Sequence, residues 1–179
     1  MSEFLLPVTP IDSLPAMPWR DKLAYLTYQF HQLEQVECPL EHSFEGEDYI
    51  RRIAIPRGTL FIGRIHKLGH VVELLSGSVL HVREKCRRVV HAPFTLKTNP
   101  GDQVCAMALT DITARTVHPA QGCTDIEALE EKYFESTQSL RDQGEQIHQQ
   151  LGKRLYERDS SRDRYSGGSW SGRYNCGRI

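Results

Sequence analysis

The stretch IPRGTLFIGRIHKLGHVVELLSG, residues 55–77, contains the pattern that decides the fold. Two short apolar runs within it, residues 59–65 and 71–75, lie on either side of Gly69. Short runs of apolar and β-branched residues that are bounded by glycine predict β-strands joined by turns. Because glycine inside such a pattern marks a turn or a bulge, we expect the chain to bend at Gly69.

The same pattern continues on both sides of this stretch, over residues 44–123. Further short apolar runs follow one another there with turn residues between them, at residues 49–55, 79–82, 89–90, 94–96, 104–109 and 112–117. Many short strands at this spacing are typical of an antiparallel sandwich or barrel. The sequence therefore predicts a mainly β domain over residues 44–123.

An amphipathic helix is predicted before this domain, within an N-terminal segment of residues 1–43. Apolar residues there recur at spacings of four and three, which places them on one helix face. They are Trp19, Leu23, Leu26, Phe30 and Leu33.

A long helix is predicted after the β domain, over residues 124–158, and a tail rich in Gly, Ser and Arg follows at residues 159–179. Thr124 and Glu127 match the capping box that begins many helices. Gly144 lowers helix propensity, as does the later Gly152, so one bent helix and two shorter helices both stay open. The tail is too polar to pack a core, and we expect it to be disordered in the isolated protein.

The formal net charge of −1 is the sum of these four segments, which carry −4, +4, −3 and +2 in chain order. A near-neutral chain argues against nucleic-acid binding and polybasic membrane binding. No run of about 18 apolar residues and no N-terminal signal pattern is present, so no membrane partner is predicted.

The five cysteines include no CxxC pair, which argues against a thiolate zinc site. The alternating segment charges favour contacts between copies, and we predict a homo-oligomer.

Residues 55–77 resemble the first cupin motif, in which Gly, five residues, His-x-His, three or four residues, Glu, six residues and Gly follow one another. Gly58, His66 and Gly77 fit this spacing. Arg64 stands where the family has its first histidine, and His70 stands where the family has glutamate. The resemblance implies a small antiparallel double-stranded β-helix, the cupin or jelly-roll barrel, flanked here by the two predicted helices and the tail.

In the cupin fold these side chains converge on a divalent transition metal, so the resemblance implies a candidate site for Fe, Mn, Ni or Zn. The second cupin motif is incomplete, because Thr98 occupies the position of its usual histidine. His118, which follows the last predicted strand, is the candidate replacement beside His66 and His70. Weaker candidates are His81 and His91. The alternative is a metal-free barrel whose histidines hydrogen-bond to one another or to water.

Arg64 changes the chemistry that this pocket favours. A fixed positive charge repels a neighbouring cation and attracts an anion, so Arg64 is a candidate anchor for a carboxylate or a phosphate. Glu73 is interpreted as a solvated strand residue rather than as an acid or base.

A wider resemblance spans roughly residues 18–125. The predicted helix, QVECPLEHSF at 35–44, IPRGTLFIGRIHKLGH at 55–70, HAPFTLKTNPG at 91–101 and TVHP at 116–119 follow one another in this order. The arrangement is similar to that of small cupin-like proteins encoded by tailed bacteriophages and prophages, which are mostly of unassigned function. It implies a fold and a viral origin rather than a reaction.

Two functions are compatible with these features. The one we favour is a non-enzymatic virion component, such as a capsid decoration, a connector or a tail-associated subunit, which requires no cofactor. Such a protein is made in the bacterial host cytoplasm and binds copies of itself and other phage structural proteins. The alternative is a metal-dependent cupin enzyme or small-ligand binder that uses His66, His70 and His118, with no catalytic residue assigned.

Overall fold

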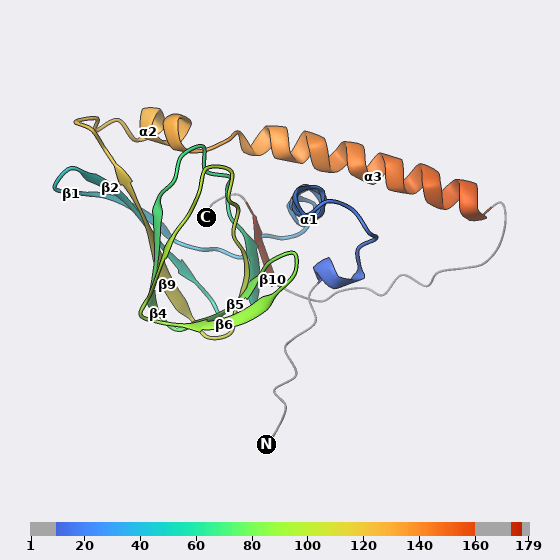
Figure 1. Ribbon diagram of the computed structural model, residues 1–179, viewed down its shortest axis with the longest axis horizontal. Coiled ribbons are helices and arrows are strands. Elements are labelled where there is room, and N and C mark those ends of the chain that lie inside the picture. The colour runs from blue at the N-terminus through green and yellow to red at the C-terminus, as the bar shows by residue number, and fades with distance from the viewer. Residues whose placement is uncertain (1–9, 160–172, 177–179) are drawn as a thin grey trace, which may run out of the picture.

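The computed structural model describes residues 10–159 and 173–176, and these form two β-sheets with helices beside them (Figure 1). The strands are β1 (Leu40–Glu45), β2 (Asp48–Ile55), β3 (Thr59–Ile62), β4 (Val71–Ser76), β5 (Ser78–Val82), β6 (Arg87–His91), β7 (Phe94–Lys97), β8 (Cys105–Ala108), β9 (Ile112–Pro119) and β10 (Arg173–Cys176). Each run predicted as a strand overlaps one of them, whereas β1 and β10 are additional to the prediction.

The two sheets each have five strands, in the orders β1-β2-β9-β4-β7 and β10-β3-β8-β5-β6. The chain crosses from one sheet to the other at each step from β2 to β5 and again at each step from β6 to β9. This is a cupin-like jelly roll, which confirms the predicted fold class. The prediction of a disordered tail falls mostly on residues 160–172 and 177–179, which lie outside the described residues, while β10 pairs in parallel with β3.

Alternation along the strands separates the barrel interior from the outer faces. On β2, Ile53 and Ile55 point inward and are buried, whereas Arg52 and Ala54 are exposed. β3 is buried on both faces. Phe61 joins the interior core, while Leu60 and Ile62 point the other way and pack against a helix. A strand covered on both faces reads as a continuous apolar run, which explains the sequence TLFI.

Helix α1 (Trp19–His31) covers the outer face of the sheet that contains β3, β5 and β8, after a short 3-10 turn, η1 (Pro10–Ser13). Leu23, Leu26 and Phe30 from the predicted apolar stripe are buried there. Leu33 lies beyond the end of the helix and is exposed. None of the helices in the described part of the chain combines the length and apolarity that a membrane crossing requires.

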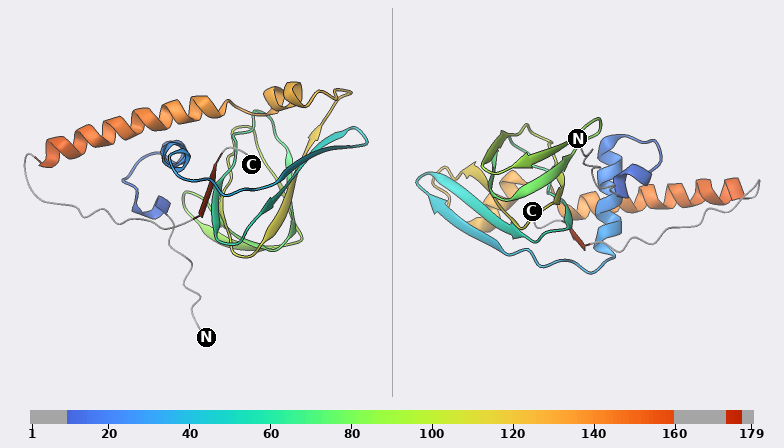
Figure 2. Two further views of the ribbon diagram at one scale, coloured as in Figure 1. Left: turned by 180° about the vertical axis from the view of Figure 1, so that it is seen from behind. Right: turned by 90° about the horizontal axis from the view of Figure 1, so that it is seen from below.

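The C-terminal region forms two helices rather than one, α2 (Ile126–Tyr133) and α3 (Thr137–Asp159). The break lies at residues 134–136, and not at either glycine. Asp125 caps α2, because its side-chain oxygen accepts hydrogen bonds from the backbone N–H of Glu127 and Ala128. The capping residue is therefore Asp125 instead of Thr124. Helix α3 crosses α1 and runs on past it, as both views in Figure 2 show.

Gly144 lets α3 approach α1 closely. A Cβ at position 144 would lie 2.2 Å from the backbone oxygen of Ala24 and 2.7 Å from Cβ of Tyr28. We expect Gly144→Ala to lower the free energy of unfolding by about 1–3 kcal/mol through this overpacking. Gly152→Ala is the matched control, because no described atom lies within 4 Å of the place that its new methyl group would take, and it is expected to stabilise by up to about 1 kcal/mol. Urea denaturation of both variants measures the difference, and equal effects would contradict the packing argument.

Candidate functional site

Three buried histidines come together next to α2. His66 and His70 lie in the irregular segment between β3 and β4, and His118 lies near the end of β9. The ring centroids of His66 and His70 are 3.4 Å apart, and that of His118 is 5.4 and 5.1 Å from them. The structure thus brings together the three histidines that the sequence analysis selected.

The segment that carries His66 and His70 is held between α2 and the loop before β8. His66 forms an isolated β-bridge with Phe134, and the backbone N–H of Lys67 donates to the carbonyl of Tyr133 at 2.8 Å. The backbone bends at residues 67 and 68, immediately before Gly69, so the turn predicted between His66 and His70 is present. Gly69 permits the close approach of this segment to Thr98, whose carbonyl oxygen would lie 2.9 Å from a Cβ at position 69.

All three histidines are neutral at pH 7. Burial is the main cause in each case, and it lowers the pKa of His66 to about 2, that of His70 to about 4 and that of His118 to about 3. The neighbouring histidines and the Arg51 guanidinium add repulsion that lowers the pKa of His66 further. A neutral imidazole offers one N–H donor and one lone-pair acceptor, and each of the two ring nitrogens needs its own partner.

Thr98 orients the His70 ring. Its hydroxyl oxygen lies 2.6 Å from Nδ1 of His70, 3.2 Å from the backbone N of His70 and 3.2 Å from the carbonyl oxygen of His70. The assignment that satisfies all three contacts has Nδ1–H and the backbone N–H donating to the hydroxyl, which donates to the carbonyl. This places the proton on Nδ1 and leaves a lone pair on Nε2. The residue at the missing ligand position of the second motif therefore sets the tautomer of His70.

Three ring nitrogens of the cluster have no hydrogen-bond partner among the described residues. They are Nε2 of His66, Nε2 of His70 and Nδ1 of His118. Neutral imidazole nitrogens are ordinary ligands of divalent transition metals, so the chemistry of the donor set fits. The arrangement of the rings does not, because no group of three or more His, Cys, Asp or Glu side chains in the described ranges is placed to hold a metal ion.

Stacking explains that arrangement. The His66 and His70 rings are inclined by 18° with their centroids 3.4 Å apart, so their lone pairs lie in nearly parallel, stacked planes and do not meet at one point. The metal-ligand role of the three histidines therefore stays a prediction.

An arginine pair lies beside the histidines. One carboxylate, that of Glu130 on α2, pairs with both: Oε1 is 3.2 Å from Nε of Arg51 and Oε2 is 3.0 Å from Nη1 of Arg64. Each guanidinium also lies 4.4 Å from the ring centroid of Phe134, which is itself 4.5 Å from the His66 ring. Phe134 therefore connects the arginine pair to the histidine cluster.

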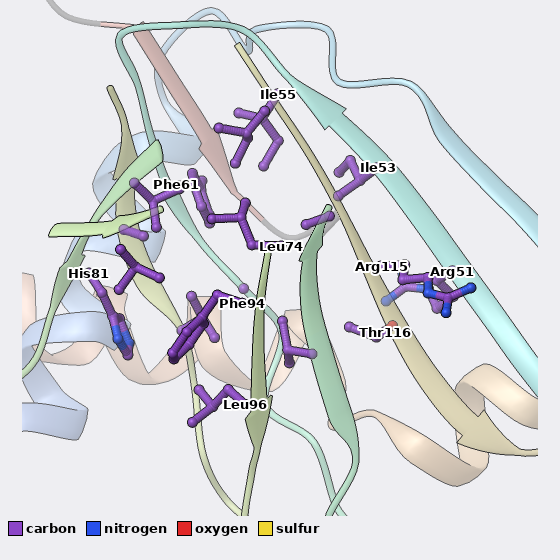
Figure 3. Close-up of a pocket in the computed structure, with 18 of the residues that line it drawn as sticks. Arg51, Ile53, Ile55, Phe61, Leu74, His81, Phe94, Leu96, Arg115 and Thr116 are labelled. Atoms are coloured by element: carbon purple, nitrogen blue, oxygen red, sulfur yellow. The ribbon is translucent and has the colours of Figure 1, made fainter. Parts of the chain in front are cut away.

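An apolar cavity of about 110 Å³ lies between the two sheets. Figure 3 shows Phe61, Leu74 and Phe94 pointing into this space from different strands, with Arg51 to one side. The lining also includes Arg64 and the two loop histidines, His66 and His70. The cavity is thus apolar along most of its wall and polar where the arginines and histidines meet.

The other candidates from the sequence lie apart from the histidine cluster. His81 on β5 lines the apolar cavity, and burial lowers its pKa. His91 is exposed and bonds to the Ser78 hydroxyl at 2.7 Å. Glu73 faces outward and pairs with Arg115 at 2.5 Å, which agrees with its interpretation as a surface residue.

Sequence reasoning missed Arg51, Glu130 and Phe134. A signal for Arg51 was present, since it falls on the same face of β2 as Ile53 and Ile55, and a charge on an apolar face marks a buried ion pair or a site. Glu130 and Phe134 gave no comparable signal, because their roles arise from where the break after α2 places them.

The fold and the site together define a cupin-like jelly roll with a polar cluster at one side of its interior. No protein-family model matches the sequence, and no curated protein matches it. Similar solved structures include a cupin-2 domain containing protein from Shewanella frigidimarina, with TM-score 0.39 and 10% identity over 52% of this chain and 91% of that chain. A cupin superfamily protein from Desulfitobacterium hafniense matches with TM-score 0.40 and 5% identity over 51% and 85% of the two chains.

An acetylacetone dioxygenase from Acinetobacter johnsonii matches with TM-score 0.37 and 10% identity over 46% of this chain. The match spans 59% of the length of that dioxygenase. These proteins are similar to this chain in fold, and their activities are not transferred to it.

Proposed function

We propose that the protein binds a small, largely apolar ligand inside the jelly roll, beside the buried histidines. The observation that supports this proposal is the cavity of about 110 Å³, whose wall is apolar over most of its area and is completed by His66, His70 and the arginine pair at one side. Apolar walls with a few polar groups at one place are typical of small-molecule sites.

Filling the cavity is expected to weaken the binding of n-butanol, an uncharged probe with an apolar tail. Ala106 on β8 is buried and lines the cavity, so Ala106→Val occupies part of the space and lowers n-butanol affinity by about tenfold or more. Ala54→Val is the matched control, because Ala54 is exposed on the outer face of β2. Titration of n-butanol into labelled protein, followed by NMR chemical shifts, measures both. No binding to the wild type, or equal binding to the two variants, would overturn the proposal.

A metal-dependent function is the second candidate, and the three unpartnered ring nitrogens favour it. It requires the stacked rings of His66 and His70 to turn so that their nitrogens meet at one point. Metal analysis of protein purified without a His tag tests this directly. About one equivalent of Fe, Mn, Ni or Zn that is lost in His66→Ala would support it, whereas a trace that the substitution does not change would count against it.

A structural role in a phage particle is the third candidate, with self-association and other virion subunits as partners and the virion as location. The feature that favours it is α3, which extends beyond its contact with α1 (Figure 1). Light scattering at increasing protein concentration tests self-association, and a monomer throughout would remove this support.

A further inference from the structure

A second, more polar cavity of about 350 Å³ adjoins the apolar one. Leu40, Arg51 and Arg64 line both, so the two cavities meet at the arginine pair. The remaining lining of the outer cavity comes from the segment before β1, from β1 and from α2: Glu37, Cys38, Pro39, His42 and Glu130. A molecule that spans the two spaces places its polar end outward and its apolar end between the sheets.

The arginine pair is built to hold a carboxylate. The side chain of Arg51 is 3% exposed and that of Arg64 is 15% exposed, and both face the single carboxylate of Glu130. A guanidinium offers several N–H donors in a plane that matches a carboxylate. Two guanidinium groups against one carboxylate leave one positive charge in this group uncompensated, which favours a second anion.

Arg64 also has an unsatisfied hydrogen-bond donor in this group. Its buried Nε–H has no hydrogen-bond partner among the described residues, although its Nη1 donates to Glu130. Glu37 is the other carboxylate at this cavity, but it is exposed, so solvent screens its repulsion of an incoming anion.

We propose that the ligand is a short-chain aliphatic carboxylate whose carboxylate binds Arg51 and Arg64 and whose tail enters the apolar cavity. The ligand carboxylate binds as the second anion, beside the Glu130 carboxylate that already pairs with both arginines. An apolar cavity of roughly 150 Å³ accommodates benzene, so the smaller cavity here fits a tail of about four carbons. This inference rests on the proposed function, because it names the ligand class of the same site.

The test compares n-pentanoate with n-butanol, which carries the same four-carbon tail, and with acetate, which lacks most of it. Isothermal titration calorimetry of the full-length wild type is expected to show pentanoate binding about tenfold or more tighter than either. Arg64→Gln is expected to bring the ratio of pentanoate to n-butanol affinity close to one, and Arg64→Lys to restore part of it. Glu130→Gln is expected to strengthen pentanoate binding, because the competing internal carboxylate is gone.

Arg52→Gln is the matched control, since Arg52 directly follows Arg51 on β2 but is exposed on the outer face of the sheet. It is expected to leave the affinity for pentanoate unchanged.

If n-butanol binds but pentanoate binds no tighter, the carboxylate class is wrong while the proposed function stands. If neither binds, both are wrong. If inorganic phosphate competes as well as pentanoate does, the tail contributes nothing and the inference is overturned. The chain-length series on the wild type decides the question even if a variant fails to fold.

Discussion

Phe134→Ala is expected to lower the free energy of unfolding by about 3–5 kcal/mol, as is usual when a buried phenylalanine is truncated. Phe134 is 2% exposed and lies at the junction of α2, the arginine pair and the histidine cluster. Removal of the ring leaves a cavity there and also takes away the aromatic face on which both guanidinium groups rest. Guanidine denaturation monitored by circular dichroism measures the change.

Two further substitutions separate these contributions. Phe134→Leu keeps most of the apolar volume and loses the ring, so it is expected to cost about 1–2 kcal/mol from the two cation–π contacts. Phe44→Ala on β1 is the control for the same truncation at a site where the side chain is 39% exposed, and it is expected to cost less than about 1 kcal/mol. A loss below about 1 kcal/mol for Phe134→Ala would show that the contacts of Phe134 at the end of α2 do not stabilise the barrel.

The fold was predictable because its signals are local. Short apolar runs separated by turn residues predicted each strand from β2 to β9, and the apolar stripe predicted α1. β1 was missed because its sequence, LEHSFE, is mostly polar, as is common for an edge strand with exposed residues. Of the two alternatives left open for the C-terminal region, the structure has two helices. Neither glycine marks the break between them, and Gly144 instead permits the close crossing with α1.

The candidate site was predictable only in part. Histidine spacing selected His66 and His70, and the position at a strand end selected His118. Their partners depend on contacts between residues far apart in the chain, such as Arg64 with Glu130, which no local pattern contains. Thr98 was recognised as a departure from the second motif, but its hydrogen bond to the His70 ring required the structure.

Acidification from pH 7 to pH 5 is expected to destabilise the metal-free protein by several kcal/mol. Burial lowers the pKa of His66 to about 2, of His70 to about 4 and of His118 to about 3, whereas histidine in the unfolded chain titrates near 6.5. Between these values the unfolded chain binds protons that the folded protein excludes, so stability is fully present above about pH 6.5 and is lost as the pH falls. Each histidine contributes about 2 kcal/mol over this interval, and the three together about 6 kcal/mol.

The groups that face the cluster do not reverse this sign. The Arg51 guanidinium lowers the pKa of all three histidines, while Asp102 partly opposes the shift at His70.

Urea denaturation in EDTA at several pH values measures the slope of stability against pH. His118→Asn removes one of the three buried imidazoles, so it is expected to reduce the slope by about a third whatever its effect at pH 7. A flat profile between pH 7 and pH 5 in the wild type would mean that the cluster admits protons without unfolding, and the neutral, solvent-excluded site on which ligand binding depends would then be absent.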